Sequence, residues 1–290
     1  MIRLQLDLEL NYEIASPGSD FIFNIHAALT PCQLVSGERL EINQSIAPEM
    51  FSDRSTGNRY ARLRAEPGPL HVSYHATIDV LHHAAAPETI GEVPVSRLPM
   101  SVLHYIYPSR YCESDRLSKL AIREFGQLWQ GYSRVEAIRS WVQNHVTFAS
   151  NTTNSNTSAI STLIEQVGVC RDFAHLMIAL CRALSIPARF VTGTDYGADP
   201  VLGPPDFHAY VEVFLGYRWY LFDPSGTAIP MGLVRVGTGR DAADVAFATI
   251  FGTVNSGPPR ILMRAITEGT PGLVMPYKCR EALSTDGELN

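Results

Sequence analysis

The 290-residue chain lacks a basic segment, a long apolar run and a regular cysteine pattern. Its 23 lysines and arginines against 29 aspartates and glutamates give a formal net charge of −6. Acidic chains without basic clusters are poor ligands for nucleic acids and anionic membranes. No stretch has the length and apolarity of a membrane span. We therefore expect neither a nucleic-acid partner nor association with a membrane.

The cysteines are too few and too irregular to form a disulfide framework, because their number is odd and their spacing uneven. The first eight residues alternate apolar and polar side chains and contain no apolar core typical of a signal peptide. We therefore expect a soluble protein of the cytoplasm, with reduced thiols. The five positions are Cys32, Cys112, Cys170, Cys181 and Cys279.

The amino-terminal third alternates apolar and polar residues with a period of two, which is typical of half-buried strands. The clearest runs cover Ile2–Leu10, Phe21–Leu29 and Leu70–Val80, and a weaker one covers Tyr60–Ala65. Turn-forming clusters rich in Pro, Gly, Ser and Asp separate the runs. The pattern predicts an antiparallel, sandwich-like β domain over residues 1–95.

Beyond a proline-containing segment, Ala84–Pro99, interpreted as a linker, the periodicity becomes helical. Ser114 and Asp115 can cap one helix, and Ser133 with Glu136 has the spacing of a capping box for a second. A longer apolar helix runs from Cys170 to about Ser185, before Pro187. Strands follow at 188–192, 208–215, 218–223 and 261–267. One helix against an antiparallel sheet predicts an α+β domain over residues 96–290.

Cys170 is the residue that carries the most chemical information. It lies in Gly-Val-Cys-Arg-Asp-Phe-Ala-His, at the predicted first turn of the long helix. The N–H groups of a helix N-terminus stabilise a thiolate. We therefore predict a nucleophilic thiol with a pKa well below about 8.5.

His208 and Asp223 are the predicted partners of this thiol. Gly216-Tyr217 is a plausible two-residue hairpin loop, and its register places Asp223 opposite Tyr210. His208 then lies on the same face, one diagonal step of about 7–8 Å away. Such an aspartate would fix the imidazole tautomer and leave the other nitrogen for the thiol. The alternative is a surface histidine beside a turn-initiating Asp-Pro pair.

A metal site is a poor interpretation of the same helix. Cys170 and Cys181 are eleven residues apart, which separates them by roughly 16 Å along an α-helix, too far for shared zinc. His175 is interpreted as a core or supporting residue. We expect neither a metal nor a cofactor.

Together the motifs GVCRDFAHLMIALCRALSIPARFVTG, HAYVEV and RWYLFDPSG resemble the bacterial transglutaminase-like superfamily, over roughly residues 130–226. The later GRDAADV and the amino-terminal β region are similar to segments of the same bacterial branch. The resemblance implies a papain-like core with a Cys-His-Asp triad. Cys170 would be the nucleophile, His208 the general base and acid, and Asp223 the orienting carboxylate. It also implies an oxyanion-binding side chain, expected in the loop 148–153.

The resemblance implies acyl transfer through a thioester, in which the thiol attacks a carboxamide or peptide carbonyl of a protein or peptide substrate. The acceptor of the acyl group is then an amine or water. A cysteine peptidase or amidase is one alternative, and a binding or scaffold protein without turnover is another. The calcium sites of animal transglutaminases have no counterpart in the sequence.

Overall fold

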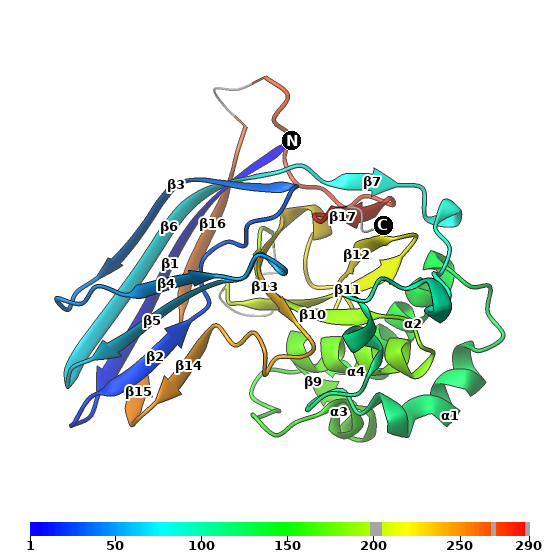
Figure 1. Ribbon diagram of the computed structural model, residues 1–290, viewed down its shortest axis with the longest axis horizontal. Helices are drawn as coiled ribbons and strands as arrows, with labels where there is room; N and C mark the ends of the chain where they lie inside the picture. Colours follow the sequence, from blue (N-terminus) through cyan, green and yellow to red (C-terminus); the bar gives the residue numbers. More distant parts are fainter. Residues whose placement is uncertain (198–204, 268–270, 288–290) are drawn as a thin grey trace.

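The computed structural model describes residues 1–197, 205–267 and 271–287. A β sandwich and a helix-rich unit lie side by side in it (Figure 1). The predicted α+β class, with an amino-terminal β region before a central-helix core, is confirmed.

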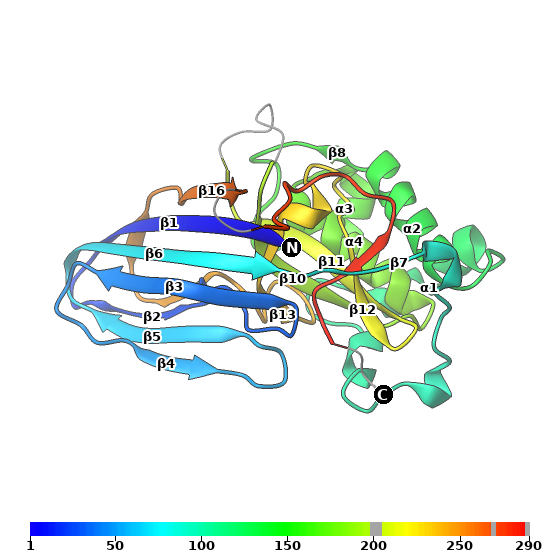
Figure 2. The ribbon, with the colours of Figure 1, turned by 90° about the horizontal axis from the view of Figure 1, so that it is seen from above.

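The sandwich consists of two antiparallel sheets whose strands come from both ends of the chain (Figure 2). The first sheet has the order β15-β1-β6-β3, with β16 also paired to β1, and the second has the order β14-β2-β5-β4. The strands of the first are β1 (Ile2–Ile14), β3 (Gln33–Ile42), β6 (Gly68–Val80), β15 (Val254–Ser256) and β16 (Arg260–Ile266). Those of the second are β2 (Ser19–Phe23), β4 (Glu49–Ser52), β5 (Arg59–Ala65) and β14 (Ala248–Phe251).

The alternation of apolar and polar side chains along β1 and β6 gives their sheet one apolar face, which packs on the second sheet. Each second side chain of these long strands points inward and is buried, while the intervening ones face solvent. The two strands pair over their whole length, from Ile2 opposite Val80 to Ile14 opposite Gly68. The inward residues pack against apolar side chains of the second sheet, among them Phe21 and Leu63.

The predicted strand Phe21–Leu29 is wrong in its second half. β2 ends at Phe23. Asn24 still bonds the residue that precedes β14, and only further along does the backbone bond the other unit. Asn24 N–H donates to the Phe247 carbonyl at 2.9 Å, and Ala28 N–H donates to the Arg235 carbonyl at 2.8 Å. The apolar periodicity there reflects burial of Ile25 and Ala27 in the sandwich core.

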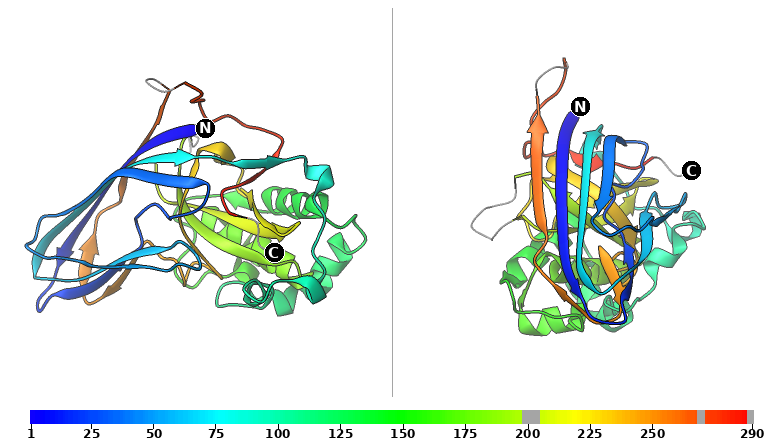
Figure 3. Two further views of the ribbon diagram at one scale, coloured as in Figure 1. Left: turned by 45° about the horizontal axis from the view of Figure 1, so that its top comes forward. Right: turned by 90° about the vertical axis from the view of Figure 1, so that its left-hand side faces the viewer.

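The carboxyl-terminal strands return to the sandwich, which changes the predicted division at residue 95. β14 pairs with β2, and both β15 and β16 pair with β1. The orange β16 lies beside the blue β1 in Figure 3. Residues 248–266 therefore complete the sandwich sheets, although the sequence interpretation grouped them with the catalytic part. Strand pairing between distant segments leaves no local signal in a sequence.

The helical unit surrounds a central helix, α4 (Cys170–Ala183). Helix α4 contacts the three other α-helices of the described residues. It also contacts two strands of a four-stranded antiparallel sheet of order β12-β11-β10-β13. The remaining helices are α1 (Ser114–Phe125), α2 (Tyr132–His145) and α3 (Ala159–Glu165). The sheet contains β10 (Ala188–Asp195), β11 (His208–Leu215), β12 (Arg218–Phe222) and β13 (Leu233–Gly239).

Smaller elements complete this unit. Two short pairs join β7 (His83–Ala85) to β17 (Ala282–Ser284) and, in parallel, β8 (Thr147–Phe148) to β9 (Val167–Gly168). Single 3₁₀ turns lie at Pro87–Thr89, Val95–Arg97, Leu103–Ile106 and Pro230–Gly232.

Two local interpretations are corrected. The segment interpreted as a linker is packed on the protein, since Ile90 and Val93 are buried and Glu92 forms an ion pair with Arg134. The proposed capping box is absent because α2 already begins at Tyr132, so that Ser133 lies inside the helix.

Sandwich side chains cover the outer edge of β13. The Asn58 side chain donates to the Thr238 carbonyl and accepts from the Thr238 N–H, both at 2.8 Å. The Gln33 side chain likewise donates to the Arg235 carbonyl at 2.8 Å and accepts from the Arg235 N–H at 3.0 Å. An uncovered edge strand exposes unpaired N–H and C=O groups. Side chains of the sandwich therefore supply hydrogen-bond partners for the backbone groups at the edge of β13 and join the two units into a continuous structure.

Within the described ranges, no helix combines the length and apolarity needed to cross a membrane. The five cysteines, all of which are described, are free thiols.

Candidate active site

Cys170 is the first residue of α4, as predicted, and the preceding Val169 is the helix N-cap. The buried carboxylate of Asp172 fixes this turn. It accepts hydrogen bonds from the Val169 N–H and the Thr153 hydroxyl, both at 2.9 Å. A carboxylate in the first turn satisfies N–H groups that have no partner within the helix. The thiol therefore projects from a rigid helix start.

The Cys170 thiol is partly buried, and its surroundings alter the predicted acidity. Burial raises its pKa to about 12, whereas hydrogen bonds from the backbone N–H groups of Ala209 and Arg171 oppose the rise. The predicted pKa well below that of a free thiol is thus wrong for the resting protein. Desolvation of the thiolate outweighs the helix N-terminus. The contact with Ala209 places the sulfur beside the start of β11.

His208 is the first residue of β11 and is 7% exposed. Its Nε2 lies 3.3 Å from Oδ1 of Asp223. The predicted hairpin register is confirmed, because Leu215 pairs with Arg218 across the two-residue loop. Both loop residues, Gly216 and Tyr217, have a positive φ, as a type I′ turn requires.

Asp223 is held by further donors, two on Oδ1 and one on Oδ2. Its oxygens accept from the Ser225 N–H at 3.0 Å, the Ser225 hydroxyl at 2.6 Å and the Ala228 N–H at 2.9 Å. Burial acts to raise the pKa of Asp223, but His208 and these donors overcome it and lower the pKa to about 2. Asp223 is therefore ionised, and its orientation is fixed.

Burial has the opposite effect on His208, because it acts to lower the pKa of the imidazole. The nearby carboxylates of Asp223 and Asp195 outweigh this effect, so the pKa lies above its ordinary value. The second carboxylate was missed in the sequence. Asp195 Oδ2 lies 3.7 Å from Nδ1 of His208. The one available signal was a polar residue just beyond the predicted strand 188–192, which in the structure extends to Asp195.

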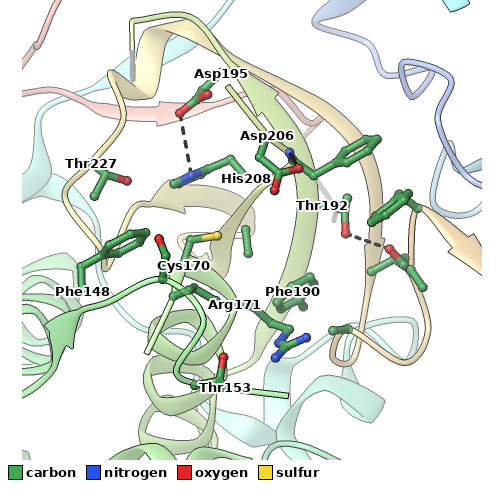
Figure 4. A pocket seen from close by; sticks show the side chains of 18 of the residues that line it. Phe148, Thr153, Cys170, Arg171, Phe190, Thr192, Asp195, Asp206, His208 and Thr227 are labelled. Carbon is green, nitrogen blue, oxygen red and sulfur yellow. Dashed lines mark hydrogen bonds and ion pairs between the residues drawn. The ribbon is translucent and has the colours of Figure 1, made fainter. Parts of the chain in front are cut away.

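Cys170 and His208 line one cleft of about 690 Å³ (Figure 4). Helix α4 contributes Cys170 and Arg171. Most other lining residues come from the loop after β8, from strand β10 with the start of β11, and from the segment 242–247. The loop predicted to contribute an oxyanion-binding side chain contributes Phe148, Ser150, Asn151 and Thr153. Of these, Thr153 already donates to Asp172. The assignment of an oxyanion donor stays a prediction.

His175 is a core residue. It is fully buried in α4, its Nε2 accepts the Ala242 N–H at 3.2 Å, and its ring stacks on Tyr111 at 5.0 Å. Burial lowers its pKa to about 3, so the ring is neutral. Its contact with Ala242 holds the segment 239–245 against α4, which explains the position of the GRDAADV motif. Among the described residues, no cluster of histidine, cysteine and acidic side chains fits a metal ion.

Comparisons with known proteins agree with this architecture. The family model of the transglutaminase-like superfamily core matches residues 123–224, and that of the bacterial transglutaminase N-terminal domain matches residues 2–101. A crystal structure of a candidate cysteine protease from Cytophaga hutchinsonii is 40% identical. It superposes with a TM-score of 0.88, covering 98% of this chain and 97% of the other.

Two uncharacterized mycobacterial proteins are similar over a shorter region. The protein from Mycobacterium leprae is 33% identical over 117 residues, and one from Mycobacterium tuberculosis is 34% identical over 125 residues. The matched regions span 42% and 40% of these relatives and 39% and 38% of this chain. The chain belongs to the transglutaminase-like superfamily and carries the bacterial transglutaminase N-terminal domain before the core.

Proposed function

We propose that this protein is an enzyme that cleaves or transfers acyl groups at amide bonds through a thioester on Cys170. The observation that carries the proposal is the orientation of His208. Because Nε2 lies at Asp223, Nδ1 is the nitrogen left for proton transfer in the cleft that Cys170 also lines. A histidine oriented by a carboxylate beside a nucleophile is the arrangement required for covalent catalysis.

The reaction has two halves. In the first, Nδ1 of His208 takes the thiol proton as sulfur attacks the carbonyl carbon of a protein or peptide amide. The C–N bond breaks, and the same proton passes to the leaving amine. In the second, water or an amine gives its proton to Nδ1 and attacks the thioester, and the proton then returns to sulfur.

The raised pKa of Cys170 determines how the first half begins. A thiol with a pKa of about 12 is protonated at neutral pH. We therefore infer that deprotonation by His208 accompanies attack on the substrate, and that no standing thiolate is present beforehand. The backbone N–H groups of Arg171 and Ala209, which already bond the sulfur, stabilise the charge that develops on it.

A cysteine peptidase is the second candidate, and the similar protein from Cytophaga hutchinsonii favours it. Peptidase and transferase share the thioester and differ in the acceptor. Incubation with a peptide mixture, with and without a primary amine, separates them by mass spectrometry. Cross-links or amine adducts indicate transfer, and shortened peptides indicate cleavage. If neither appears and no ester or amide acylates Cys170, the proposed function is wrong.

A further inference from the structure

Asp195 carries a buried carboxylate oxygen that the proposed reaction does not yet use. The side chain is 4% exposed, and its Oδ2 has no hydrogen-bond donor among the residues that the structure describes. The distance from this Oδ2 to Nδ1 of His208 is 3.7 Å, which is longer than a usual N–H···O hydrogen bond. A buried carboxylate without a donor is costly and calls for an explanation. A ligand that brings its own N–H groups supplies one.

Strand register explains why this carboxylate faces the cleft. Gly193 of β10 lies opposite His208 of β11, and Asp195, two residues further, shares its face. Continuing the same register places Asp206 opposite Asp195. Both carboxylates line the cleft around His208 (Figure 4).

Among the described residues that line the cleft, the one arginine, Arg171, is engaged elsewhere. Arg171 donates to the Asn154 carbonyl at 2.9 Å and lies 3.6 Å from the Asp172 carboxylate. The wall around Nδ1 of His208 therefore carries two carboxylates, Asp195 and Asp206, and among the described lining residues no arginine or lysine side chain is directed to them. A cationic ligand could bind these two carboxylates.

The position of Asp195 identifies which part of a substrate it would contact. Nδ1 of His208 delivers the proton to the departing amine and takes one from the incoming acceptor, so both must occupy the same place beside it. Asp195 borders that place. A group bound by Asp195 therefore lies on the amine side of the amide bond.

We propose that Asp195 is a specificity-determining residue that binds the ammonium group of a primary amine acceptor beside Nδ1 of His208, an inference that rests on the function proposed above. Charge favours the ammonium over water, because a desolvated carboxylate bonds a cation more strongly than a neutral donor. The stacked rings of Phe207 and Phe247, 4.4 Å apart, line the same cleft and offer an apolar surface for the aliphatic stem of the amine.

The step balances as follows. The bound ammonium loses one proton to Nδ1 of neutral His208, and its freed lone pair attacks the thioester carbonyl. The C–N bond forms, the C–S bond breaks, and the proton on Nδ1 passes to the sulfur. The second proton lost by the nitrogen goes through the carboxylate of Asp195 to solvent, leaving a secondary amide and the free thiol.

The full chain, acylated with p-nitrophenyl acetate, tests the inference with two acceptors. Cadaverine is cationic at neutral pH, whereas hydroxylamine is neutral. In Asp195→Asn, the preference for cadaverine over hydroxylamine should fall about tenfold or more, the effect expected for loss of a charged hydrogen-bond partner. Asp115→Asn, an exposed change of the same charge on α1, is the control and should keep the preference. An unchanged preference in Asp195→Asn would overturn the inference.

Calorimetric titration of cadaverine into Cys170→Ala tests the site without turnover. Adding Asp195→Asn to this variant should weaken binding about tenfold. Equal binding with and without Asp195, or no binding to Cys170→Ala, would refute the inference. Absence of p-nitrophenol release by the wild-type chain would instead refute the proposed function.

Discussion

Nε2 of His208 lies 3.3 Å from Oδ1 of Asp223, and the aspartate in turn is held by the backbone and hydroxyl of Ser225. This chain of contacts fixes which imidazole nitrogen faces the aspartate. It leads to a direct prediction for Asp223→Asn. The amide removes the larger of the two carboxylate charges that hold the pKa of His208 above its ordinary value, while the opposing effect of burial remains.

In Asp223→Asn we therefore expect the pKa of His208 to fall, as followed by NMR of the imidazole ring. The loss of kcat/KM should lie between about 10² and 10⁴, the upper figure being the loss in serine-protease triads. An unchanged pKa would show that Asp223 does not control His208.

Acid stability gives a second prediction for the same residue. A folded-state pKa of about 2, below the ordinary 3.8, means that ionised Asp223 stabilises the fold above about pH 4. The contribution, about 2 kcal/mol, is lost as the pH falls from about 4 to 2. Denaturation of the wild type and Asp223→Asn should therefore show unfolding free energies that converge over this interval. Curves that stay parallel would contradict the assignment.

The raised pKa of Cys170 predicts slow alkylation at low pH. Labelling of Cys170 by iodoacetamide, followed by peptide mapping, should be slow at about pH 6 and should accelerate continuously towards about pH 9. In His208→Ala the rate near neutral pH should fall, because the base is absent. A rate that is already maximal at about pH 5 would indicate a preformed thiolate–imidazolium pair.

The bonds across the two units predict a stability effect. Asn58→Ala leaves the N–H and carbonyl of Thr238 unpaired at a buried edge, so we expect a loss of about 1–3 kcal/mol in unfolding free energy. Asn43→Ala is the matched control. Asn43 also makes two backbone hydrogen bonds, but it is exposed, so its loss should stay below about 1 kcal/mol. Equal losses of unfolding free energy in the two variants would show that covering the edge of β13 does not contribute to stability.

Local patterns were enough to predict much of the site. The helix N-terminus at Cys170 and the hairpin of His208 and Asp223 follow from short-range periodicity and turn chemistry. Asp195 was not predictable in this way. Its place beside His208 depends on the pairing of β10 with β11, whose connection contains residues 196–207, and no local signal sets that register.

The same distinction applies to the fold. Strands β1 and β6 are long and alternate regularly, so the sequence revealed them. Strand β3, largely solvent-exposed, and β13, buried throughout, lack alternation and were missed. The return of β16 to β1 is a long-range contact, as is burial of the Cys170 thiol. Both depend on segments far apart in the chain.

The most direct test of the account is the site of acylation. After brief treatment with p-nitrophenyl acetate, mass spectrometry of the whole chain and its peptides should find one acetyl group, on Cys170, as a thioester that hydroxylamine removes. The Cys170→Ala chain should remain unmodified. Acetylation of Cys170→Ala to the same extent, or modification of Cys32 or Cys279 in place of Cys170, would contradict the account.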